Sequence, residues 1–293
     1  MSDQYFYHSF SRFLKNESIE DNNKRAFQTL ESILKNGILF VPEEIKLPFD
    51  IENPLKPIVQ HRVCFTLIER SELSRHSDIF GKFSIEFNTN FLRKIGITPA
   101  MYLPIFNYDD DKHLENVFSK FVYRLLKFHQ DARKEADQVN KDLNDALRNF
   151  NPVKILELKI KKQEMLEKTA WFEGLSNMIY PIDNKRYTQE NGYYQQREWK
   201  LPANITNNGV DIAEIANLSQ QKELLAINKE FFSKKINYIG QEYQRCMISL
   251  FLKNFEEKHI LEQANKIIVP EKNIDEVKKL LRAYNISLYV EGL

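Results

Sequence analysis

The sequence predicts an α+β protein in which a mixed sheet core is interrupted by a long helical insertion and followed by C-terminal helices. Three observations predict this fold class. Short aromatic or β-branched runs begin and end the chain, amphipathic helical spacing separates them, and no strand signal occurs between Phe106 and Ile179. A chain of 293 residues is long enough to bury a sizeable core.

Composition limits the classes of partner. The 42 Lys and Arg residues nearly balance the 41 Asp and Glu residues, so the overall charge indicates neither a nucleic acid nor a membrane. Cys64 and Cys246 are too few for a disulfide framework or a cysteine zinc site, which predicts a reducing compartment. The N-terminus lacks a signal-peptide pattern and no apolar run of about 18 residues occurs, so we expect a soluble, cytoplasmic protein without a membrane partner.

Residues 1–108 are predicted to form the first half of the core, with strands and short helices in turn. Apolar spacing predicts a helix over residues 24–35 that stops at Gly37, and Ser71 is the expected N-cap of a short helical turn. The alternation of residues 82–87 is typical of a half-buried strand. The other expected elements are strands over 5–10, 38–42, 61–67 and 100–105 and a helix over 89–95.

Residues 109–178 are predicted to form a helical hairpin inserted into the sheet domain, with its turn at residues 149–152. The second helix has dense lysines opposite an expected apolar side made of Ile155, Leu156, Leu158, Ile160, Met165 and Leu166. Residues 179–293 would supply the second half of the core. The elements expected there are a strand over 193–201, a long and mostly helical stretch over 218–259, and a closing strand–helix–strand over 266–270, 274–284 and 286–290.

Residues 192–202 combine aromatic, acidic and basic side chains in one β-prone run. A strand here places Glu198 on one face and Arg197 and Trp199 on the other. Glu198 is then either a solvated carboxylate, which the strand pattern alone favours, or a functional one. No phosphate-binding glycine loop, His-Glu-x-x-His or Gly-x-Ser-x-Gly motif occurs, and the 6 histidines are scattered, so no metal site is predicted.

Three groups of fragments occur in a fixed order along the chain. They are Tyr7-His8-Ser9-Phe10 with residues 30–37, then Val63-Cys64-Phe65-Thr66 with His76 and residues 80–87, and finally residues 194–200. Together they resemble the AbiGi-type abortive-infection family of bacterial phage-defence proteins. The resemblance covers residues 5–105, residues 190–202 and the closing strand–helix–strand, and leaves out the helical section 110–178.

That family looks related to DarT-like ADP-ribosyltransferases, so the resemblance implies an ADP-ribosyltransferase-like core. It implies a toxin that transfers ADP-ribose from NAD+ to a macromolecular acceptor, nucleic acid among the candidates, without a metal. Glu198 would be the catalytic carboxylate that stabilises an oxocarbenium-like transition state. The resemblance implies that His8 holds the ribose, with Ser9 also binding the cofactor, and that Phe65 and Thr66 lie in the strand that frames the nicotinamide. Tyr7, Phe10, Tyr193 or Tyr194 would stack on the nicotinamide, and Arg62 and Arg197 would bind the pyrophosphate.

The alternative is a non-catalytic antitoxin or sensor that binds a partner protein through its helical regions. Both interpretations imply a cognate partner, whether antitoxin, toxin or chaperone. The sequence departs from the family pattern at Ser9–Ser11, where Thr is more usual, and near Gln195 or Gln196, where an acidic residue is more usual. The enzyme interpretation makes one geometric prediction: the side chains of His8 and Glu198 converge on a single cleft.

Overall fold

The structure is a computed structural model that describes residues 4–45, 58–103, 117–176, 178–181, 197–207, 210–238 and 240–293. The chain divides into two compact units. The first combines residues 1–45, 58–100 and 187–293, and the second combines residues 46–57 and 101–186. The predicted boundary at residue 108 lies outside the described residues, so the division into three segments stays a prediction.

A large mixed sheet organises the first unit, as the α+β class requires. Its central strand is β3 (Ile58–Glu69), which pairs antiparallel with β2 (Ile38–Ile45), with β1 (Gln4–Phe10) and with β8 (Glu198–Pro202). The order runs β11–β14–β2–β3–β1–β4–β17–β18, with β5 paired to β8. The remaining bounds are β4 (Phe83–Phe87), β5 (Thr98–Pro99), β11 (Glu214–Ile215), β14 (Leu250–Leu252), β17 (Ala264–Val269) and β18 (Tyr289–Gly292).

The first helix, α1 (Ile19–Asn36), begins earlier than predicted because Ser18 caps it. The Ser18 hydroxyl accepts the backbone N–H of Asp21 at 3.0 Å. Gly37 ends the helix, as predicted, with φ +90°. A Cβ atom at this position would lie 2.0 Å from the carbonyl oxygen of Leu252, so the chain can turn into β2 here only with a glycine.

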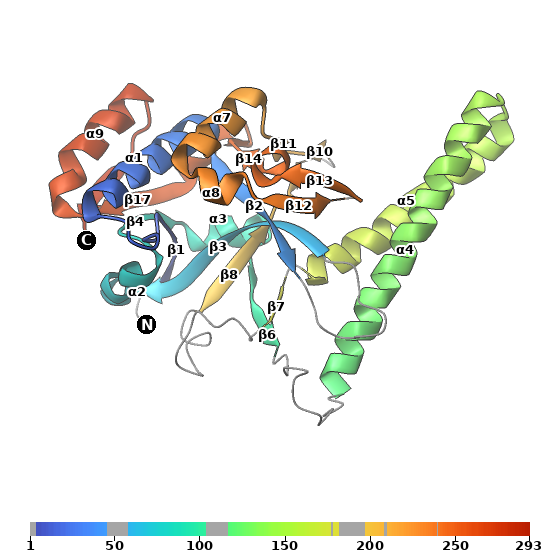
Figure 1. The fold of residues 1–293 in the computed structure, drawn as a ribbon, viewed down its shortest axis with the longest axis horizontal. Coiled ribbons are helices and arrows are strands. Elements are labelled where there is room, and N and C mark those ends of the chain that lie inside the picture. The colour runs from blue at the N-terminus through green and yellow to red at the C-terminus, as the bar shows by residue number, and fades with distance from the viewer. Residues whose placement is uncertain are drawn as a thin grey trace. The chain divides into compact units, whose positions relative to one another are not determined.

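Helices cover both faces of the sheet around β1 and β4. Figure 1 shows α1 and α9 (Ile274–Ala283) on one side of these strands and α2 (Leu73–Phe80) on the other. The main core lies on the first side and includes Phe6 and Leu281, whereas a smaller cluster on the second side contains Tyr7 and Leu73. Because β4 is buried along its whole length, the prediction of a half-buried strand over residues 82–87 is wrong.

The start of the segment after β3 also differs from the prediction. A 3₁₀ turn over Arg70–Glu72 precedes α2, and the backbone N–H of Glu69 donates to the Glu72 carboxylate at 3.1 Å. Ser71 therefore lies inside the turn and is not the N-cap. The helix predicted over residues 89–95 is present as α3 (Thr89–Lys94), which Asn88 caps.

The long helical stretch predicted over residues 218–259 is wrong. Asn228 ends α7 (Leu218–Ile227) and caps the short α8 (Lys229–Phe232). The chain then forms two small hairpins, β12 (Lys235–Tyr238) with β13 (Gln241–Gln244) and β15 (Asn254–Phe255) with β16 (Lys258–His259). Lys235 to Tyr238 alternate polar and apolar residues, and Gly240 in the turn has φ +78°, so local strand pairing prevails over helical spacing.

The closing strand–helix–strand is confirmed. β17, α9 and β18 follow one another, and β17 pairs with β18 in parallel through Ile267 opposite Val290. Val277 and Leu281 are buried on α9 and pack into the main core. The C-terminal strand therefore completes this side of the sheet.

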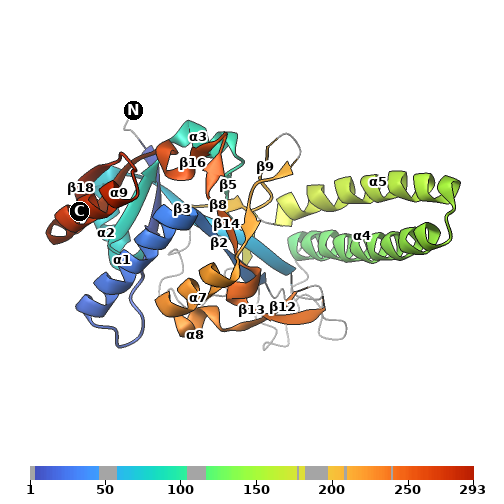
Figure 2. The ribbon, with the colours of Figure 1, turned by 90° about the horizontal axis from the view of Figure 1, so that it is seen from above.

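The second unit contains two long helices, α4 (Val117–Arg148) and α5 (Pro152–Ser176). They run side by side in both Figure 1 and Figure 2. Val139, Leu143 and Leu158 are buried between them. The turn lies where the sequence predicts it, with Phe150 at φ +50° and the Asn151 side chain accepting the backbone N–H of Lys154 at 3.1 Å. Two short strands, β6 (Met101–Leu103) and β7 (Ile179–Pro181), also belong to this unit.

Candidate functional site

The pairing of β3 with β8 fixes the direction of every side chain on β8. Phe65 lies opposite Trp199, and Thr66 lies opposite Glu198. The Trp199 ring contacts Phe6 of the main core, with ring centroids 5.2 Å apart. Because successive strand residues point to opposite faces, Glu198 points to the face away from this core. We call the two sides of β3 the core face, which carries Phe65, and the polar face, which carries Thr66.

His8 lies on the core face. Its ring is 5.5 Å from that of Phe65, and its Nδ1 lies 3.0 Å from the backbone oxygen of Cys64. Burial lowers the pKa of His8, which favours the neutral imidazole. Glu198 lies on the polar face, so His8 and Glu198 do not converge on one cleft as the enzyme interpretation predicts. The cause is the register: Tyr7 pairs with Thr66, which turns His8 to the opposite side of the sheet.

Two buried cations, Lys200 and Arg62, lie on the polar face near Glu198. The Lys200 Nζ atom lies 3.9 Å from Glu198 Oε1, and Lys200 is 0% exposed. Arg62 donates from Nε and Nη2 to Glu43 Oε2 at 2.9 and 2.5 Å, and from Nη1 to Gln60 at 2.6 Å. Arg62, expected at a pyrophosphate, is thus bonded to protein groups. Arg62 and Lys200 are thus each compensated by a carboxylate, Arg62 by Glu43 and Lys200 in part by Glu198.

The pKa shifts in this cluster follow from burial and neighbouring charge. Burial lowers the pKa of Lys200, because it disfavours the ammonium form. Burial alone would raise the pKa of Glu43, but Arg62 and Lys200 overcome it and hold that pKa below its usual value. Burial and the carboxylate of Glu198 raise the pKa of Cys64 well above its ordinary value, so its thiol stays protonated and is a poor nucleophile.

A second polar group lies further along the same face. Thr66 Oγ1 is 2.8 Å from Nε2 of His76, whose Nδ1 is 3.4 Å from Ser9 Oγ. Ser9 also lies 2.8 Å from the Ser84 hydroxyl. Burial and the positive charge of Arg12 lower the pKa of His76 to about 4. The structure therefore joins Ser9 and Thr66, both predicted to bind a cofactor, through a neutral histidine.

The remaining predicted residues are dispersed. The Tyr7 hydroxyl donates to Glu86 at 2.9 Å, on the polar face, and burial raises the pKa of Tyr7. Phe65 is buried in the main core. Arg197 has φ +45° and pairs with Glu72 at 2.9 Å, near the start of α2. Residues 192–196, the first part of the stretch that contains Glu198, lie outside the described residues.

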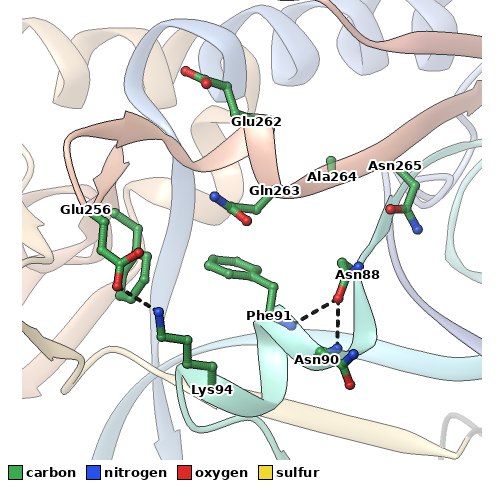
Figure 3. A pocket seen from close by; sticks show the side chains of 10 residues that line it. Asn88, Asn90, Phe91, Lys94, Glu256, Glu262, Gln263, Ala264 and Asn265 are labelled. Carbon is green, nitrogen blue, oxygen red and sulfur yellow. Dashed lines mark hydrogen bonds and ion pairs between the residues drawn. The ribbon is translucent and has the colours of Figure 1, made fainter.

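A separate pocket of about 380 Å³ lies between α3 and the β15–β16 hairpin. Figure 3 shows Lys94 paired with Glu256, at 2.7 Å, and the Asn88 side-chain oxygen accepting the backbone N–H groups of Asn90 and Phe91. The wall is mostly amide and charged side chains, with aromatic rings beneath. Its lining residues are Asn88, Asn90, Phe91, Lys94, Phe255, Glu256, Glu262, Gln263, Ala264 and Asn265, which include none of the predicted site residues.

Comparison with known proteins identifies the family. A family model described as abortive phage resistance protein AbiGi, antitoxin, matches residues 51–260. The chain belongs to the AbiGi family. No curated protein and no solved structure is similar enough to count as a match. The predicted link to DarT-like enzymes and the ADP-ribosyltransferase-like core therefore stay predictions.

The antitoxin description of the AbiGi family overturns the leading functional prediction, a toxin that transfers ADP-ribose. The resemblance to the AbiGi family is confirmed. The function inferred from it is wrong, because the prediction assigned the toxin role, whereas the family description gives the antitoxin role. The co-substrate NAD+, which was part of that prediction, stays a prediction. Within the described ranges, no cluster of three His, Cys, Asp or Glu side chains could hold a metal ion, and no helix is long and apolar enough to cross a membrane.

Sequence reasoning missed Lys200, Glu43 and Glu86. A signal for Lys200 was available, because strand alternation places it on the same face as Glu198. Glu86 is 2% exposed and accepts hydrogen bonds from Tyr7 and Asn265. Nothing local in the sequence indicates that a carboxylate between Ile85 and Phe87 is buried, because that depends on the strands on either side.

Proposed function

We propose that this AbiGi protein is the antitoxin of an abortive-infection system and restrains a cognate toxin by binding it, without catalysis. The observation that carries the proposal is the family match over residues 51–260, with its antitoxin description. The partner is a protein, and a nucleic-acid acceptor is not part of the proposal. The cytoplasmic location expected from the sequence belongs to the proposal as well.

The contacts of the predicted site residues support a binding protein. Arg62 is bonded to Glu43 and Gln60, and Arg197 to Glu72. Ser9 and Thr66 share His76, and Tyr7 is bonded to Glu86. These polar groups stabilise the sheet and its helices, which explains their residue types without a substrate.

Co-expression tests the proposal. The protein encoded by the adjacent gene is expressed alone and together with the AbiGi chain, and cell growth and phage protection are measured. We expect the neighbour alone to arrest growth, and co-expression to restore growth and to yield a complex stable to gel filtration. Glu198→Gln should restore growth as well as the wild type does.

The controls separate binding from chemistry. Glu276→Gln, an exposed carboxylate on α9, is the matched control for the loss of one negative charge. The proposal fails if the purified pair forms no complex. It also fails if Glu198→Gln, folded and still bound to the neighbour, no longer relieves toxicity, because a catalytic role would then be required.

A further inference from the structure

Helix α5 is apolar on two opposite sides. Ile155, Leu158 and Met165 lie on the side that packs in the hairpin, where Leu158 is 6% and Met165 2% exposed. At about 100° per residue, Val153, Leu156 and Ile160 lie on the opposite side of the helix. They are 68%, 63% and 56% exposed. Leu156 and Ile160 are therefore not on the packed side, and the single apolar side predicted for this helix is wrong.

Phe150, in the turn that precedes α5, is also exposed, at 89%. We call Phe150, Val153, Leu156 and Ile160 the outer stripe. It ends sharply, because the next positions on the same side of α5 are Gln163 and Glu167, which bond to one another. A group of large apolar side chains exposed to water is unfavourable for an isolated protein and is typical of a binding surface.

The spacing of the outer stripe indicates the shape of its partner. Val153, Leu156 and Ile160 follow one another at intervals of three and four residues, the spacing of a seam between two helices. Lys159 flanks the seam on one side and Glu157 on the other. A partner helix fits best when it carries apolar residues at the same spacing, an acid opposite Lys159 and a base opposite Glu157.

The size of the outer stripe argues against a second copy of this chain as the occupant. From Val153 to Ile160 the seam is only about 11 Å long. Four side chains there offer a few hundred Å² at most, whereas a stable dimer buries about 800 Å² on each partner. Two copies held together by this seam alone would bury too little area to form a stable dimer. A toxin that also contacts other surfaces of the chain can use the seam as one part of a larger interface.

We propose that an amphipathic helix of the cognate toxin packs on the outer stripe of α5. This inference rests on the proposed antitoxin function and names the surface that carries it. The AbiGi match includes the whole of the α4–α5 hairpin, since both helices lie within residues 51–260. Binding of a toxin helix explains why this exposed side of α5 is apolar, which the packing of the hairpin does not explain.

The test uses the full-length chain and the protein encoded by the adjacent gene as the probe. Leu156→Gln with Ile160→Gln removes the seam and keeps residues of good helix propensity. Lys168→Gln changes an exposed α5 residue about two turns beyond Ile160 and is the control. We expect the seam variant to weaken binding at least tenfold, and the control to bind within about twofold of the wild type.

Circular dichroism and thermal unfolding of the seam variant should match those of the wild type, because both side chains are solvent-exposed. If the seam variant binds the neighbour as tightly as the wild type, this inference is wrong while the antitoxin function stands. If the wild type binds no neighbour, both are wrong. If the wild type is a dimer in light scattering and the seam variant a monomer, the occupant is a second copy and the inference is again wrong.

Discussion

Glu17 should make the stability of the first unit depend on pH in a way that can be worked out from its contacts. Its carboxylate accepts hydrogen bonds from Nε and Nη2 of Arg25, from the Asn22 side chain and from the backbone N–H of Leu14. Its side chain is only 8% exposed. Glu17→Gln removes the charge from the loop that joins β1 to α1 and keeps the shape of the side chain.

The hydrogen bonds from Arg25 lower the pKa of Glu17 from 4.5 to about 2, against the opposing effect of burial. At about 1.4 kcal/mol per pKa unit, this shift corresponds to at most about 3.5 kcal/mol. Screening and the cost of ordering two long side chains near the surface reduce the expected loss to about 1–2 kcal/mol. Because the folded pKa is the lower one, the contribution is complete above pH 4.5 and disappears as the pH falls towards 2.

Urea unfolding of the wild type and of Glu17→Gln at pH 7, 4 and 3, followed by circular dichroism, checks this prediction. The difference in unfolding free energy should be largest at pH 7 and shrink at each lower pH. Glu20→Gln, an exposed residue in the first turn of α1, is the matched control and should cost under about 0.5 kcal/mol. A difference for Glu17→Gln that stays constant with pH, or equals that of the control, would refute the argument.

Two further substitutions test the packing of the first unit by chemical denaturation. Gly37→Ala should lower the unfolding free energy by at least about 3 kcal/mol, because the new Cβ atom would lie 2.0 Å from the Leu252 carbonyl oxygen. Gly96→Ala should lower it by only about 1–2 kcal/mol, because Gly96 has φ +94° but open space around it, so only backbone strain is added. Equal costs would show that the close approach is irrelevant. Tyr7→Phe should cost about 1–3 kcal/mol, because it removes one donor from the buried Glu86 carboxylate; a loss below about 0.5 kcal/mol would contradict that role.

The elements that the sequence predicted correctly are those with clear local signals. β1 and β3 are aromatic or β-branched runs, and Gly37 marks the end of α1. The closing β17–α9–β18 unit has a proline after its first strand and an amphipathic helix. The apolar residues of 218–259 fit both helical and strand spacing, so their pattern does not distinguish the two. Asn228, which ends α7 and caps α8, interrupts the long helix that was predicted there.

The candidate site could not be predicted, because strand alternation fixes faces only within one strand. The relation between His8 on β1 and Glu198 on β8 passes through two registers, with Tyr7 opposite Thr66 and Thr66 opposite Glu198. A shift of one residue between β1 and β3 would have placed His8 on the polar face with Glu198. Such a register depends on the packing of the whole sheet, and no local sequence motif specifies it.

The same alternation gives Glu198 a structural explanation. Trp199 and Leu201 point into the main core, so the residues between and before them, Lys200 and Glu198, must share the polar face. An ammonium group as buried as that of Lys200 needs opposite charge nearby, and the Glu198 carboxylate, at 3.9 Å, supplies part of it. The position of Glu198 next to Trp199 is therefore explained by strand alternation and by the charge of the buried Lys200.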